Sequence, residues 1–152
     1  MKKRLAFLVA VLWGAVLAAG GAGLYSGYPE VFGIQLVTAE DWRISVGLLP
    51  GEMAGESPSV ALSLDLILAS DEIFNDDASG IGISYYAGAG GVASLLRSNP
   101  EAGIRAMLGL QFYSSEVASL GVFAELQLGQ RFTFAPLGAD PYLGFRVGIS
   151  LR

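Results

Sequence analysis

Apolar residues alternate with small or polar residues along most of the chain after residue 30, with a period of two. The C-terminal segment shows this best, because every second position from Leu143 to Leu151 is apolar and glycine, arginine or serine fills the others. Successive side chains of a β-strand point to opposite faces, so the period predicts strands with one apolar face. The predicted strands cover residues 32–38, 42–48, 60–68, 80–90, 103–112, 120–129 and 142–151, with residues 23–28 as a weaker eighth candidate.

Turn-forming residues separate these segments. They are Glu40-Asp41, Pro50-Gly51, Ser57-Pro58, Asn75-Asp76-Asp77, Asn99-Pro100 and Asp140-Pro141. Such residues adopt turn conformations readily and interrupt regular strands. Because the spacing is short and no helical pattern intervenes, we predict an all-β fold, an antiparallel meander closed into a small up-and-down β-barrel of about eight strands. Closure is the usual way in which a meander removes its exposed edges.

The first 22 residues have the three-part layout of a secretory signal peptide. A basic tripeptide at positions 2–4 precedes an apolar run over residues 5–19, and small residues follow it. The run is shorter than the roughly 20 residues that a membrane-spanning helix needs. We therefore predict a signal-peptide helix over residues 1–22, with cleavage after Ala18 or Ala22, and one β-barrel domain over residues 23–152.

The face opposite the leucines consists mostly of the small residues glycine, serine and alanine, and it carries the charged residues of the predicted strands. These are Arg43, Asp65, Arg105, Glu125, Arg131 and Arg146. Glycine weakens a strand whose side chains face water, whereas small residues fit the narrow interior of an eight-stranded barrel. We therefore expect the charged residues to form a network in the lumen and the leucines to point outward. Glu125 in particular is expected to be paired, because an isolated buried carboxylate is unfavourable.

Two questions about this interior stay open at the level of sequence. The charged residues could line a polar channel or pair with one another and fill the lumen, and the small diameter of the barrel favours the filled lumen. The pleat could also be inverted. The chain would then be a soluble exported barrel, periplasmic or secreted, that binds an apolar ligand in a leucine-lined cavity.

From residue 23 to the C-terminus the chain resembles the small outer-membrane β-barrel proteins of bacteria, of the eight-stranded type. The signal peptide, the two-residue repeat with internal charges and the amphipathic last strand, Tyr142–Leu151, carry the resemblance. It implies an outer-membrane protein of the cell envelope with a structural or weakly pore-forming role, whose partners are membrane lipid and the outer-membrane assembly machinery. Candidates for its aromatic girdles are Trp42, Phe112, Phe132, Phe134 and Tyr142.

The most acidic stretch of the sequence contains Asp71, Glu72, Asn75, Asp76 and Asp77. Clustered carboxylate and amide oxygens suit hard cations such as calcium, but the spacing is not that of an EF-hand loop. We interpret the stretch as a solvated loop outside the membrane, with cation binding as the alternative.

Composition narrows the remaining function classes. The chain has neither histidine nor cysteine, which removes the commonest general base and the usual ligands of zinc. Gly88-Ala89-Gly90-Gly91 lacks the lysine and the helix of a phosphate-binding loop. With nine basic and 14 acidic residues, the chain is a poor candidate for nucleic-acid binding. We therefore expect no enzymatic activity, no cofactor and no dedicated metal centre, and no specific protein partner can be inferred.

Overall fold

The computed structural model describes residues 19–38, 41–50, 58–76, 78–95, 100–114, 120–134 and 136–151. They form eight antiparallel strands that close into a barrel, which confirms the predicted fold class. The strands are β1 (Ala19–Tyr28), β2 (Phe32–Thr38), β3 (Trp42–Leu49), β4 (Ser59–Asp76), β5 (Ile81–Leu95), β6 (Glu101–Ser114), β7 (Leu120–Phe134) and β8 (Leu137–Leu151). Among the described residues, no helix has the length and apolar character needed to cross a membrane.

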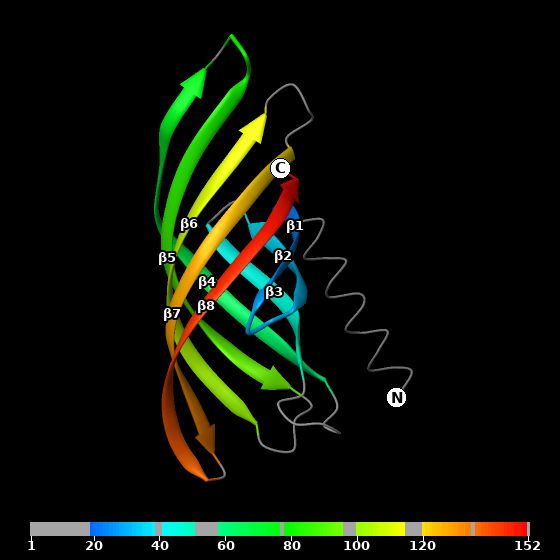
Figure 1. Ribbon diagram of the computed structural model, residues 1–152, viewed down its shortest axis with the longest axis vertical. Coiled ribbons are helices and arrows are strands. Elements are labelled where there is room, and N and C mark those ends of the chain that lie inside the picture. Colours follow the sequence, from blue (N-terminus) through cyan, green and yellow to red (C-terminus); the bar gives the residue numbers. More distant parts are fainter. Residues whose placement is uncertain are drawn as a thin grey trace.

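Each strand pairs with its neighbours in sequence, and β8 returns to pair with β1 through residues 145–151 (Figure 1). The ends of β2, β4, β6 and β8 therefore lie at one end of the barrel, here called the upper end. The ends of β1, β3, β5 and β7 lie at the opposite, lower end. Because the number of strands is even, β1 starts at the end where β8 finishes.

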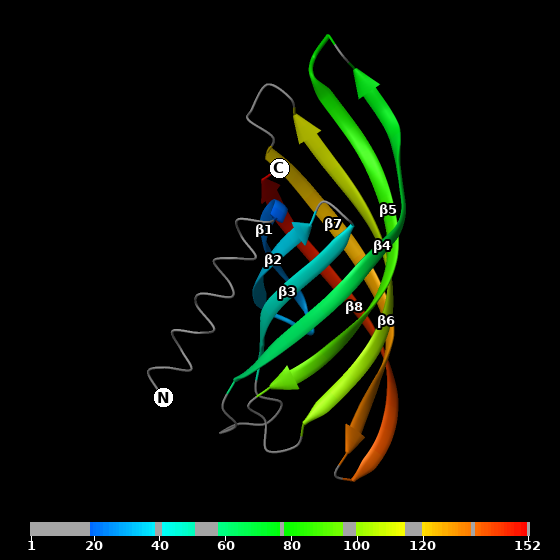
Figure 2. The same ribbon diagram turned by 180° about the vertical axis from the view of Figure 1, so that it is seen from behind.

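The wall of the barrel has an uneven height. Strands β1 to β3 contain 7 to 10 residues, whereas β4 to β8 contain 14 to 18. Figures 1 and 2 show the long β4–β5 hairpin rising above the short strands and the β7–β8 hairpin descending below them. The register of β3 with β4 ends at the Trp42–Leu66 pair, so the upper part of β4 pairs only with β5.

Several sequence-based boundaries were wrong. The weak eighth candidate is a full strand, and it begins at Ala19 rather than residue 23. Asp71 to Asp76 extend β4 instead of forming a loop, because β5 pairs with them down to the Asp76–Ile81 pair. Asp140-Pro141 lies inside β8 rather than in a turn. Proline is tolerated there because β1 reaches only as far as Phe145, which leaves this part of β8 with a free edge. Residues 1–18 of the predicted signal-peptide helix lie outside the described residues, and its last four residues belong to β1.

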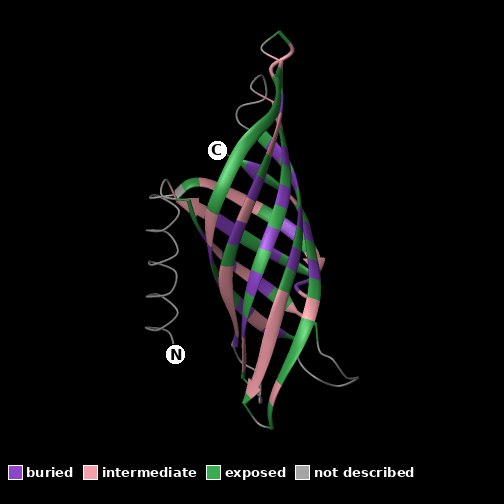
Figure 3. Cartoon of the chain, turned by 90° about the vertical axis from the view of Figure 1, so that its left-hand side faces the viewer, coloured by how far each residue is buried: buried purple, intermediate pink, exposed green. Residues whose placement is uncertain are grey.

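The two faces of the sheet are oriented as the sequence predicted. Along β7, Glu125 and Gln127 are almost fully buried, whereas Leu126 and Leu128 are 59% and 66% exposed. Figure 3 shows buried and exposed positions alternating along the strands around the barrel. The leucine face is therefore the outer surface, so the alternative of a leucine-lined internal cavity is wrong.

The glycines of the inner face lie opposite aromatic residues. In five directly cross-strand pairs an inward-facing ring covers a glycine of the adjacent strand, and a Cβ at that glycine would collide with the ring. The pairs are Tyr25–Gly33, Tyr86–Gly109, Tyr113–Gly82, Phe123–Gly148 and Tyr142–Gly129. Aromatic cover of a strand glycine pins the register and restores packing. Tyr142 therefore faces the lumen, and its assignment to an aromatic girdle was wrong.

We predict that Gly109→Ala lowers the free energy of unfolding by about 1–3 kcal/mol, because the new methyl group would overpack the space under the Tyr86 ring. Gly91→Ala is the matched control, since a Cβ there meets only the Gly103 carbonyl oxygen at 3.6 Å. Urea-induced unfolding of the two variants under the same conditions measures the difference. Equal stabilities of the two variants would show that the position of the Tyr86 ring does not require glycine at position 109.

Candidate functional site

Six charged side chains meet at mid-height in the lumen and form a layer that we call the septum. The septum consists of the arginines Arg43, Arg105 and Arg146 and the carboxylates Glu30, Asp65 and Glu125. Each of these residues is at most 4% exposed. Ion pairs of this kind are stable only where charges balance and hydrogen bonds satisfy the remaining atoms. The three positive and three negative groups meet the first condition.

Asp65 lies at the centre of the septum because two arginines share its carboxylate. Arg43 stands directly opposite it on β3 and donates from Nε and Nη2 to Oδ2, both at 3.3 Å. Arg105 approaches from β6, with Nε 3.0 Å from Oδ1 and Nη2 2.7 Å from Oδ2. On the other side of β4, Gly90 is the partner of Asp65, and a side chain there would collide with the carboxylate. The glycine thus leaves the space that the ion pairs occupy.

Glu125 has three hydrogen-bonding partners, in agreement with the expectation that it would be paired. Arg43 Nη1 lies 2.6 Å from its Oε2, and the Tyr86 hydroxyl donates to the same oxygen at 2.9 Å. The Gln127 amide donates to Oε1 at 2.7 Å. The Glu125 carboxylate therefore accepts hydrogen bonds from a guanidinium, a phenol and an amide. These hydrogen bonds compensate for the loss of its hydration on burial.

Glu30 is the member of the septum that sequence reasoning missed. It lies in the connection between β1 and β2 rather than on a strand, and its side chain accepts from Arg146 Nε and Nη2 at 2.8 and 2.6 Å. Arg105 Nη1 lies 3.6 Å from its other oxygen, and the Arg146 guanidinium stacks on the Tyr25 ring at 4.2 Å. The strand pattern placed four arginines but only two carboxylates in the lumen. This imbalance of charge indicated that a further acidic side chain should enter the lumen.

Arg131 is the predicted network residue that the septum does not include. It points inward near the lower end of β7 and forms an ion pair with Glu101 at 3.7 Å. Its side chain is 31% exposed, so this pair is partly solvated. The structure therefore joins five of the six predicted charged residues and places the sixth in a separate, more exposed pair.

The septum divides the lumen into two chambers. The upper chamber has a volume of about 370 Å³ and is lined by Arg43 and Tyr86 among others, whereas the lower chamber has about 100 Å³ and is lined by Glu30 and Arg105. The two sets of lining residues do not overlap. Arg43 above and Arg105 below both bond to Asp65, so the layer between the chambers is one carboxylate thick at this point. The septum therefore separates these two chambers at mid-height.

The acidic stretch at the top of β4 uses its oxygens in local hydrogen bonds. Glu72 accepts from the Tyr113 hydroxyl and from the Asn75 amide, and Asp71 accepts from the Glu72 backbone N–H. Asp76 accepts from the Ser79 hydroxyl at 2.6 Å and from the Ala78 N–H at 3.1 Å.

These hydrogen bonds at Asp76, first of all that from Ser79, hold the pKa of its carboxyl below the usual value. Within the part of the chain that the structure describes, no three acidic side chains converge closely enough to hold a metal ion. Asp77, also predicted as part of this stretch, lies outside that part.

The geometry of the septum favours a role in stabilising the barrel over a role in catalysis. Asp65 and Glu125, the carboxylates that could act as an acid–base pair, both accept hydrogen bonds from arginine and are almost fully buried. A general base has to reach a proton of the substrate, whereas these two carboxylates are already bound to arginine side chains of the barrel.

We find no match to this chain among protein-family profiles, curated proteins or solved structures.

We predict that Asp65→Asn lowers the free energy of unfolding by about 3–5 kcal/mol, because Arg43 and Arg105 would lose the anion that they share. Glu101→Gln is the control and should cost about 0–1 kcal/mol, since its pair with Arg131 is partly exposed. Chemical denaturation followed by tyrosine and tryptophan fluorescence compares the variants. A similar small loss in both would mean that the septum contributes little to stability.

Proposed function

We propose that the protein is a small bacterial outer-membrane β-barrel with a structural role in the cell envelope. The observation that carries this proposal is the inverted distribution of polarity, with charges in the lumen and aliphatic side chains on the outside. Water would favour the opposite arrangement, and soluble monomers rarely expose continuous apolar surface larger than a few hundred Å². A closed barrel also pairs its backbone groups internally, as a bilayer requires.

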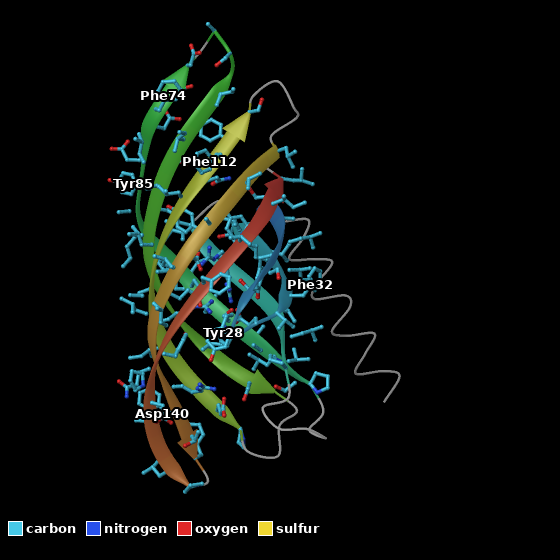
Figure 4. The ribbon with its side chains drawn as sticks, viewed as in Figure 1. Tyr28, Phe32, Phe74, Tyr85, Phe112 and Asp140 are labelled. Carbon is cyan, nitrogen blue, oxygen red and sulfur yellow. The ribbon has the colours of Figure 1, made fainter. Side chains whose placement is uncertain are left out.

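Exposed aromatic residues near both ends of the strands support this proposal. Trp42 begins β3, while Phe74 and Phe112 lie near the ends of β4 and β6, so all three belong to the upper end. At the lower end, Tyr28 finishes β1 and Phe32 begins β2. Figure 4 shows Phe74, Tyr85 and Phe112 above Tyr28 and Phe32. Exposed aromatic rings towards both ends of the strands, with aliphatic residues between them, resemble the girdles of membrane barrels.

The septum favours a structural role over that of a diffusion pore. It interrupts the lumen with ion pairs between groups of the barrel itself, so a hydrated solute would have to break several of them to pass. In small barrels side chains commonly fill the interior. We therefore infer that the barrel has a structural role in the envelope and that it conducts ions weakly or not at all.

Lipid and the outer-membrane assembly machinery are the partners that this proposal implies. The last strand presents one continuous apolar face to the outside, because every second residue from Leu143 to Leu151 is exposed. These residues are Leu143, Phe145, Val147, Ile149 and Leu151. Lipid would contact this face after insertion, and we propose that the same strand is the segment that the assembly machinery recognises.

We expect the untagged protein to fractionate with the outer membrane and to need detergent for extraction. The N-terminus of that form should be Ala19, since cleavage after Ala18 leaves β1 whole, whereas cleavage after Ala22 would remove its first four residues. Cell fractionation followed by N-terminal sequencing tests both points. Recovery of the barrel in the soluble periplasmic or secreted fraction would contradict the membrane assignment.

Leu126→Arg should lower the free energy of unfolding by about 2–4 kcal/mol if the middle of β7 lies at the bilayer midplane. Leu137→Arg is the matched control, because Leu137 begins β8 at the lower end and is 85% exposed. It should cost about 0–1 kcal/mol near the membrane surface. Urea titrations in lipid vesicles compare the two variants, and equal losses would argue against a depth-dependent lipid contact.

The native barrel should show no steady ion current in a planar lipid bilayer, because the septum closes its lumen. A wide porin inserted under the same conditions provides the positive control for insertion and detection. A stable, ohmic current from the native barrel would favour an open channel and would contradict the closed lumen while leaving the membrane location untouched.

A further inference from the structure

The upper part of β4 is a free strand edge, because within the described part of the chain it pairs only with β5. Its register with β3 ends at Leu66, and the last backbone hydrogen bond on that side runs from the Ile67 N–H to the Asp41 carbonyl at 3.0 Å. Beyond this point the β4–β5 pairing continues to the Asp76–Ile81 pair (Figure 2). This edge therefore presents backbone N–H and C=O groups that point away from β5.

The free edge of β4 is accessible and chemically complete. Every residue from Leu68 to Asn75 is exposed, on whichever face of the hairpin its side chain lies. This stretch contains neither proline nor glycine. The free lower edge of β8 differs, because Pro141 lacks the N–H that strand pairing requires. Of these two edges, only the one on β4 keeps an unbroken row of backbone donors.

Two β-bulges limit the regular part of this edge. The pairing of β4 with β5 shifts register between Ile67 and Ala69 and again between Glu72 and Phe74. A bulge bends its strand, which is one way in which proteins protect an edge from uncontrolled pairing. Residues 69–72 between the bulges keep their regular pairing. The edge therefore has room for a short added segment rather than for a long strand.

An added segment would complete the wall of the barrel beside β4, where the wall is low. It would lie above the end of β3, in the place that a longer β3 would occupy. Ser70, in the middle of the regular stretch, also lines the upper chamber, so the segment would become part of the rim of that chamber. Because the closed barrel holds β4 in position, only the incoming segment has to become ordered on binding.

The charges on this edge indicate the chemistry of the segment. Asp71 and Glu72 are neighbours, so their side chains point to opposite faces, and each face of the hairpin carries a carboxylate. The groups that donate to Glu72 are a phenol and an amide, which leave its negative charge in place. The sequence has no basic residue between Arg43 and Arg97, so the hairpin contains no cation of its own to neutralise these carboxylates.

These carboxylates favour a basic partner over a second copy of the chain. Pairing of two β4 edges would bring the same carboxylates together, and like charges on facing strands are destabilising. A lysine or arginine on either face of an added segment would instead meet an opposite charge. We propose that residues 69–72 of β4 accept a short, extended, basic segment of a partner protein by strand addition, with backbone hydrogen bonds providing affinity and the carboxylates providing specificity.

The test uses the full barrel in an uncharged detergent, with a short synthetic peptide of alternating lysine and valine as the probe. Hydrogen exchange measured by NMR reports on the backbone amides of residues 69–72. With the peptide at about 100 times its Kd, the amides that point away from β5 should exchange about a hundredfold more slowly, because only the unbound fraction exchanges. The same peptide N-methylated throughout keeps its charge but cannot donate backbone hydrogen bonds, so it should protect none of them.

Asp71→Asn combined with Glu72→Gln should weaken binding of the lysine–valine peptide about fivefold, the effect expected from the loss of two cross-strand charge pairs. Asp140→Asn is the matched control, because Asp140 is an exposed acid on the free edge of β8, next to Pro141. It should leave the affinity unchanged. All three substitutions keep the size of the side chain, and thermal unfolding verifies that each variant has folded.

Several outcomes would overturn the proposal. They are the absence of protection at residues 69–72, equal protection by the N-methylated peptide, equal binding of a glutamate–valine peptide, and equal affinity of the native barrel and the double variant. Protection of these amides that appears without peptide and increases with protein concentration would identify a second copy of the chain as the occupant, which would also overturn it. None of these results depends on whether the barrel resides in a membrane.

Discussion

Three guanidinium groups inside a narrow barrel impose the constraint on which the rest of this structure depends. Removing a charge from water is very unfavourable unless an opposite charge and further hydrogen bonds replace the lost hydration. Asp65, Glu125 and Glu30 supply the opposite charges, and Tyr86, Gln127 and Ser63 supply hydrogen bonds. Since these groups come from strands far apart in sequence, the septum can form only when the barrel is closed. Closure of the barrel therefore completes the charge compensation.

The same constraint accounts for the composition of the inner wall. A guanidinium that crosses the lumen needs space on the facing strands, and glycine provides it, as Gly90 does beside Asp65. Glycine also weakens a strand, and the inward aromatic rings compensate by lying across the glycines of the next strand. The Tyr86 ring covers Gly109 while its hydroxyl binds Glu125. One side chain thus stabilises both the wall and the charged layer.

Much of this arrangement could be predicted from sequence because it follows from a local rule. The two-residue period indicates which residues share a face, and the number of strands limits the diameter, so the barrel and the inward charges at Arg43, Asp65, Arg105, Glu125 and Arg146 could be derived. Glu30 could not, because a connection has no period from which to infer the direction of its side chain. Arg131 shares the inner face, but it lies near the lower end of β7 and lines the lower chamber. Asp140-Pro141 resembled a turn because the free edge that tolerates proline depends on where β1 stops.

The uneven wall has a consequence for the bilayer in which we propose that the barrel resides. A membrane-spanning strand needs about 9–11 residues, and β4 to β8 exceed this length whereas β2 and β3, with 7 and 8 residues, fall short. The apolar surface that lipids contact along β2 and β3 would therefore be shorter than the one on the opposite side of the barrel. A bilayer accommodates a short hydrophobic surface by thinning beside it. The barrel would thus act as an asymmetric inclusion, with compressed lipid on one flank and a preferred tilt relative to the membrane normal.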